Sequence, residues 1–181
     1  MNNLRSGAYW VGHFFTIIAT IIGIYYASIV GLETGVKLEM IQADRGTYYV
    51  ASSLYSELES NIERMDESIK LFDKRKFSKD SANKVRFNDF IFQSAKYSDS
   101  TFEIEPEILT GISEYYFTVQ GLIHDYKFNN LNHVLMIVEI KKATEAFKAQ
   151  KIMEKLSAYN KALAKSIENR GVNLSQPAFS L

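Results

Sequence analysis

The sequence predicts an all-α protein with one N-terminal transmembrane helix followed by an antiparallel helical bundle of about four helices. Two observations carry this prediction. The segment Ser6–Leu32 contains no Asp, Glu, Lys or Arg, so every formal charge except that of Arg5 follows it. Beyond Gly46 the apolar residues recur at steps of three or four, as in amphipathic helices. From Thr47 to Arg170 the only residues that weaken helices strongly are Gly111, Gly121 and Pro106.

The composition excludes several classes of function. Lys and Arg total 21, and Asp and Glu also total 21, so the net charge is zero. A general nucleic-acid binder relies on a basic excess, and we therefore expect no nucleic acid among the partners. The chain has no cysteine, which removes disulfide frameworks, thiolate metal sites and cysteine nucleophiles.

The charge-free segment is long enough to span a membrane. From Ala8 the chain reads AYWVGHFFTIIATIIGIYYASIVGL, and a helix needs roughly 20 predominantly apolar residues to cross the hydrocarbon core. Aromatic side chains typical of membrane interfaces lie toward both ends of this stretch: Tyr9, Trp10, Tyr25 and Tyr26. A cleaved signal peptide with Arg5 as its basic region is the alternative, although the apolar stretch exceeds a usual signal-peptide core.

Small residues recur at every fourth position of the predicted span: Ala19, Gly23, Ala27, Gly31 and Gly35. Lipid gives helices no hydrophobic drive to associate, so spanning helices pair through close backbone contact, which small residues permit. We therefore predict a transmembrane packing face whose partner is a helix of another protein or of a second copy of this chain. The alternative is that Gly and Ala are simply common in spanning helices.

The remaining chain is expected to fold as one helical region. We assign residues 1–35 to the N-terminal tail and transmembrane helix, 36–46 to a connector, 47–170 to the bundle and 171–181 to an irregular tail. The first bundle helix is expected from Thr47 to Lys74, and its apolar face consists of Val50, Leu54, Leu58, Ile62, Met65, Ile69 and Phe72.

Three further helices are expected. The second begins at Asp80 or Ser81, either of which fits an N-cap, and extends to about Tyr97. Pro106 fits the first turn of the third, which ends near Lys127. A turn at Asn129 and Asn130 then leads into one long helix from Leu131 to Asn169, closed by Gly171.

A polar pair stands out on the first bundle helix. Asn61 lies at a step of three or four from Leu58 and Met65, which puts it on or beside the buried face, and Glu57 lies one turn before it. A buried amide must find hydrogen-bond partners, and such groups can fix helix register. We predict a buried polar pair with that role, with ligand binding at Asn61 as the alternative.

No catalytic, cofactor-binding or metal-binding set is recognisable, and we expect a protein that is not an enzyme and needs no cofactor. The chain has no Glu-x-x-His pair for a di-metal site in a bundle. The weaker candidates have simpler interpretations: a haem or metal ligand at His13, a metal site at His124, Asp125 and His133, a carboxylate row at Glu103, Glu105 and Glu107, and a lipid-binding cluster at Lys74, Arg75, Lys76 and Lys79. We interpret them as an interfacial histidine, solvated loop residues, a helix start at Pro106 and a solvated helix-helix loop.

The first third of the chain resembles a loose class of uncharacterised bacterial single-span membrane proteins. These have an N-terminal span, a short charged connector and a helix with the pattern E-L-x-x-N, here Glu57, Leu58 and Asn61. The resemblance implies a single-pass protein of the bacterial plasma (inner) membrane and implies no activity. The side of the membrane that the bundle occupies stays open, because Arg5 flanks one end of the span and Lys37 and Arg45 flank the other.

Two functions from different classes agree with these features. The first is a non-enzymatic accessory or scaffold subunit of a membrane protein complex, anchored in the lipid bilayer by one span and docking through its tyrosine-rich bundle. The alternative is a membrane-anchored sensor or regulator whose bundle binds a small ligand.

Overall fold

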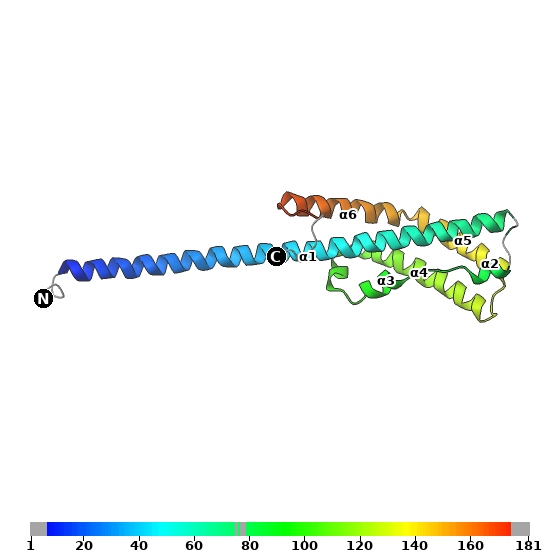
Figure 1. Cartoon of the computed structure of the whole chain (residues 1–181), viewed down its shortest axis with the longest axis horizontal. Helices are drawn as coiled ribbons and strands as arrows, with labels where there is room; N and C mark the ends of the chain where they lie inside the picture. Colours follow the sequence, from blue (N-terminus) through cyan, green and yellow to red (C-terminus); the bar gives the residue numbers. More distant parts are fainter. Residues whose placement is uncertain (1–6, 75, 77–78, 175–181) are drawn as a thin grey trace. The chain divides into compact units, whose positions relative to one another are not determined.

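The computed structural model describes residues 7–74, 76 and 79–174, and all regular structure there is helical (Figure 1). The chain divides into two compact units, Met1–Gln42 and Ala43–Leu181, which are described separately. The longest helix, α1 (Gly7–Asp73), contributes to both. The other elements are α2 (Lys79–Asn83), α3 (Phe90–Ala95), the 3-10 helix η2 (Asp99–Glu103), α4 (Pro106–Lys127), α5 (His133–Ala149) and α6 (Ile152–Asn169). The predicted all-α class is confirmed.

The first unit consists of the N-terminal part of α1, whose described side chains are nearly all exposed. By length and composition, this helix contains a stretch apolar enough to cross a membrane, with a mean hydropathy of 2.0. Its threonine hydroxyls are bonded within the helix: Thr16 donates to the carbonyl of Gly12 at 2.9 Å, Thr20 to that of Thr16 at 2.8 Å and Thr34 to that of Val30 at 2.8 Å. Such internal bonds let a polar side chain lie in an apolar environment.

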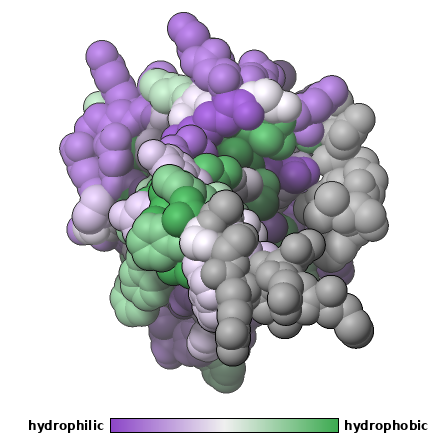
Figure 2. Space-filling view, turned by 90° about the vertical axis from the view of Figure 1, so that its left-hand side faces the viewer, coloured by the Kyte–Doolittle hydropathy of each residue, from purple (hydrophilic) through white to green (hydrophobic). Residues whose placement is uncertain are grey.

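Figure 2 shows hydrophobic residues, in green, and hydrophilic residues, in purple, on the surface of the chain. The predicted connector, residues 36–46, is helical and belongs to α1, and the two units divide within it, between Gln42 and Ala43.

In the second unit, the C-terminal part of α1 buries the predicted apolar face. Leu54, Leu58, Ile62, Met65 and Ile69 are buried in one core cluster, and Val50 and Phe72 pack against it half-buried. Two ion pairs fix the direction of α5, because Lys148 binds Asp66 at 2.7 Å while Lys141 binds Asp73 at 3.1 Å. From the first pair to the second, the residue number increases on α1 and decreases on α5, so these two helices are antiparallel.

The helix α4 occupies the predicted range, with Pro106 in its first turn, where a missing N–H costs nothing. It runs antiparallel to the chain from α5 to α6, since Tyr115 contacts Thr144 and Glu107 pairs with Lys155. Its buried side includes Ile108, Ile112, Tyr115, Val119 and Tyr126. The long helices of the second unit are therefore the end of α1 together with α4, α5 and α6.

The predicted fourth helix, Leu131–Asn169, is wrong as a single helix because the chain breaks at Gln150 and Lys151. Lys151 has a φ of 56°, in the left-handed region. The buried positions explain the break: Phe147 and Ile152 are both buried, and a step of five does not fit one face of a regular helix. The left-handed turn reorients the chain, so that the apolar sides of α5 and α6 both face the core.

The predicted second helix is also wrong as a single helix. It is replaced by α2, the non-helical segment of residues 85–89 and α3. The physical reason lies in α1, whose side chains of Glu57 and Asn61 bond to the backbone of residues 88–92, as described below. Backbone groups engaged in this way cannot take part in the bonds of a continuous helix.

Two glycines of α4 should respond differently to alanine. An added Cβ at Gly111 would meet Ile152 Cδ1 at 2.7 Å and Cγ1 at 2.8 Å, whereas one at Gly121 meets nothing within 4 Å. Alanine gains about 1 kcal/mol of helix propensity at either site, and overpacking costs about 1–3 kcal/mol at Gly111 alone. We expect Gly121→Ala to raise the free energy of unfolding and Gly111→Ala to lower it relative to Gly121→Ala, measured by urea unfolding in mild detergent. Equal stabilisation by both variants would contradict the close contact with Ile152.

Candidate functional site

Asn61 is fully buried on α1 and bonds to the backbone of a segment distant in sequence. Its amide nitrogen Nδ2 donates to the carbonyl of Asn88 at 2.5 Å, and the N–H of Asn88 donates to Asn61 Oδ1 at 2.9 Å. One side-chain amide thus satisfies both backbone groups of the residue, as a neighbouring strand would. This pairing holds the segment 85–89 against α1 without secondary structure of its own.

Glu57, one turn earlier on α1 and 5% exposed, bonds to the start of α3. Its carboxyl oxygens accept from the N–H of Ile91 at 2.7 Å and from the N–H of Phe92 at 3.0 Å. The first N–H groups of a helix have no partner within the helix, and the residue before α3, Asp89, makes no side-chain capping bond. Glu57 therefore caps α3 from another helix.

Tyr116 of α4 completes this group. Its hydroxyl donates to Glu57 Oε1 at 2.9 Å and accepts from Asn61 Nδ2 at 3.3 Å. The ring is fully buried, with its centroid 4.8 Å from that of Phe87 and 4.4 Å from that of Phe92. Burial, and next the hydrogen bond to Glu57, raise the pKa of Tyr116. We call Glu57, Asn61 and Tyr116 the polar clamp.

The polar clamp contains both residues of the predicted buried polar pair. The structure brings Glu57 and Asn61 together on one face of α1, and their spacing of four was the signal in the sequence. Sequence reasoning missed Tyr116, which it treated only as one of many tyrosines. The polar atoms point at backbone groups and at each other, which is the geometry of a support for the segment 88–92.

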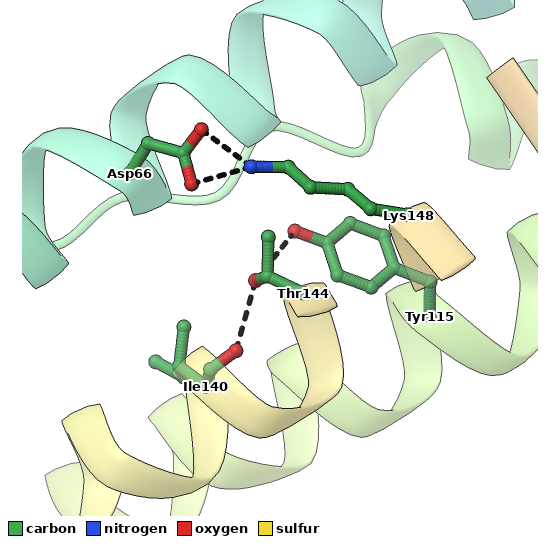
Figure 3. A network of polar contacts seen from close by, with 5 residues as sticks. All are labelled: Asp66, Tyr115, Ile140, Thr144 and Lys148. Atoms are coloured by element: carbon green, nitrogen blue, oxygen red, sulfur yellow. Dashed lines mark hydrogen bonds and ion pairs between the residues drawn. The ribbon is translucent and has the colours of Figure 1, made fainter. Parts of the chain in front are cut away.

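A second buried polar contact joins α4 to α5 (Figure 3). The hydroxyls of Tyr115 and Thr144 lie 3.3 Å apart, and Thr144 Oγ1 donates to the carbonyl of Ile140 at 2.8 Å. The ring of Tyr115 stacks on Phe147 with centroids 4.5 Å apart. Burial raises the pKa of Tyr115 to about 12, and the charge of nearby Asp66 acts in the same direction while the bond to Thr144 opposes it.

The predicted transmembrane packing face is exposed along its whole length. Ala19, Gly23, Ala27, Gly31 and Gly35 all lie on the N-terminal part of α1, and a Cβ added at any of the three glycines would meet nothing within 4 Å. In a regular α-helix each member of this series lies close to the side of the member before it, and the series turns gradually around the helix along its length. Packing of a partner helix on these residues stays a prediction.

The weaker candidates lie apart from the polar clamp. His124 is exposed, with its ring 4.4 Å from that of Phe128, and the described residues contain no group of three or more potential metal ligands. Glu103 ends η2, Glu105 precedes α4 and Glu107 pairs with Lys155, so these carboxyl groups form no row on a strand. Arg75 of the basic cluster and residues 175–181 of the tail lie outside the described residues.

Removing one acceptor from the polar clamp should destabilise the fold. In Glu57→Gln one carboxyl oxygen becomes an NH2 group, which leaves the N–H of Ile91 facing a donor. A buried donor without a partner costs about 1–3 kcal/mol, and we expect that loss in the free energy of unfolding. The matched control is Glu67→Gln, an exposed position on the same helix. Equal stability of the two variants would show that the carboxyl oxygen facing Ile91 is dispensable.

The raised pKa of Tyr115 predicts a loss of stability in alkali. The fold favours the neutral phenol, so this contribution is fully present below the ordinary tyrosine pKa of about 10 and is lost as the pH rises through about 12. We expect Tyr115→Phe to flatten the decline of unfolding free energy between about pH 9 and about pH 12. Tyr97→Phe, at a side chain that is 90% exposed, should leave the decline unchanged, and a flattening by both variants would refute the assignment.

The comparisons with known proteins give no relative from which a role could be taken. No family model matches this chain, and neither does a curated protein or a solved structure. The resemblance to bacterial single-span proteins at Glu57, Leu58 and Asn61 stays an interpretation of the sequence. The function is therefore argued from the geometry of α1 and its polar clamp.

Proposed function

We propose that this protein is a non-enzymatic accessory or scaffold subunit of a membrane protein complex in the bacterial plasma membrane. One span anchors the protein, and the helical bundle docks on the partner. The observation that carries the proposal is that a single helix, α1, bears both the exposed small-residue face and the residues that hold the bundle's segment 88–92.

The exposed face supports a partner within the membrane. Gly23, Gly31 and Gly35 have open space around them, and a second helix could approach the backbone closely there. The partner is a transmembrane helix of another protein or of a second copy of this chain. Either would remove lipid from a face that offers close backbone contact.

The polar clamp supports a structural role for the bundle. An acid-base or nucleophilic group needs access to a substrate. The side chains of Glu57 and Asn61 instead form hydrogen bonds with the backbone of residues 88–92. The strongest buried polar cluster described in this chain thus serves the fold. A rigid bundle on a helical anchor is what a docking subunit requires.

The alternative, a membrane-anchored sensor or regulator, rests on a different property of the same residues. Because Glu57 and Asn61 belong to α1, a shift of this helix along its axis would alter their bonds to the segment 88–92. A ligand that favours one arrangement would couple the bundle to α1.

The small-residue face can be tested by filling it. We expect Gly23→Leu combined with Gly31→Leu to release partner proteins during pull-down in mild detergent, because the added side chains prevent close backbone approach. The control combines Ile21→Leu with Ile29→Leu, which has the same spacing on another side of α1. Mass spectrometry identifies and quantifies what co-purifies. Unchanged co-purification with the glycine variant would refute packing through this face.

A further inference from the structure

A pocket of about 440 Å³ opens between the segment 85–89 and the C-terminal half of α4. Three apolar side chains form its wall: Val85, Phe87 and Ile123. Val85 and Ile123 are each only 7% exposed. The ring of Phe87 is fixed from behind, with centroid distances of 4.8 Å to Tyr116 and 5.8 Å to Tyr115. One part of the lining is therefore apolar and held in place by the bundle core, while Arg86, Gln120, His124 and Lys127 make up the rest.

Two basic side chains, Arg86 and Lys127, line the same pocket from opposite elements. Both are exposed, and neither forms an ion pair or a hydrogen bond within the part of the chain that the structure describes. Six other basic residues each lie within 3.1 Å of a carboxyl oxygen: Lys37, Lys141, Lys142, Lys148, Lys155 and Arg170. Lys161 and Lys165 resemble Arg86 and Lys127 in having no ion pair among the described residues, but they do not line this pocket. The two charges at the pocket are thus available to an external anion.

Two acidic residues contact side chains that line this pocket, but they do not line it themselves. Asp89 Oδ2 accepts from the side-chain amides of Gln120 at 2.7 Å and of Gln93 at 3.0 Å. Asp125 lies 3.7 Å from Nδ1 of His124, which also lines the pocket. No carboxyl group is among the lining residues. An anion in the pocket would therefore meet Arg86 and Lys127 directly and the carboxyl groups only at a greater distance.

We propose that this pocket binds a small organic anion with an apolar body, of the class of aryl phosphates. The guanidinium of Arg86 and the ammonium of Lys127 bind the phosphoryl oxygens through charge-assisted hydrogen bonds. The apolar body lies against Val85, Phe87 and Ile123, away from water. An apolar wall with a few convergent polar groups gives orientation as well as affinity.

Binding at this pocket acts on the polar clamp. The segment that supplies Arg86 and Phe87 also supplies Asn88, whose backbone is held by Asn61. A ligand seated against this segment stabilises the folded arrangement, because it binds the native state alone. The pocket thus places a ligand site next to the bonds that join the segment to α1, whether or not the chain has a membrane partner.

The binding test uses three probes on the full chain in a non-ionic detergent, followed by isothermal titration calorimetry. Phenyl phosphate has both the anion and the apolar body, inorganic phosphate has only the anion, and benzyl alcohol has only the body. We expect phenyl phosphate to bind at least about tenfold more tightly than either partial probe and to bind more weakly at high salt. Absence of phenyl phosphate binding up to about 10 mM, or equal binding of inorganic phosphate, would overturn the proposal.

A charge-matched pair of variants locates the site. We expect Arg86→Ala with Lys127→Ala to weaken phenyl phosphate binding at least about tenfold. The control, Lys161→Ala with Lys165→Ala, removes the same charge from exposed positions of α6 and should retain the affinity within about twofold. All four side chains are exposed, so an unchanged unfolding midpoint is expected for both variants. Equal loss of binding in both would show diffuse charge attraction and refute this pocket.

Discussion

The second unit depends on one constraint, which is that buried polar groups must be hydrogen-bonded. Asn88, Ile91 and Phe92 lie in or beside a non-helical stretch whose backbone has no neighbouring strand and only six residues of α3 behind it. Glu57 and Asn61 supply the missing acceptors and donors from α1. Without them this part of the chain would have to expose its backbone to water or continue as helix. The same bonds hold Phe87 and Phe92 in the segment that packs against the ring of Tyr116.

The polar clamp also depends on the regularity of α1. A side chain holds a distant backbone segment only if its own backbone is rigid, and α1 is regular through both residues. The apolar segment at its N-terminal end contains the small-residue face, and the C-terminal end contains the clamp. The apolar segment and the polar clamp are therefore parts of the same helix, α1.

Prediction from the sequence succeeds for those parts of the fold that depend on local periodicity. It is less accurate where hydrogen bonds between distant residues determine the local structure. The range of α4 follows from Pro106 and its regular apolar positions, and the burial of Asn61 follows from its place between Leu58 and Met65. The chain after Asp80 reads as one helix because its apolar spacing is helical. The bonds that prevent this join residues 27 to 35 positions apart, which no local pattern reveals. Tyr116 was missed for the same reason.

The left-handed turn at Lys151 has a consequence for cooperativity. Because backbone hydrogen bonding of the helix is interrupted there, fraying of α6 does not have to propagate into α5. The two helices also differ in how firmly they are held: α6 buries Ile152, Leu156 and Ile167 over 18 residues, whereas α5 buries five residues over 17. We therefore expect the amide hydrogens of α6 to exchange faster than those of α4 and α5.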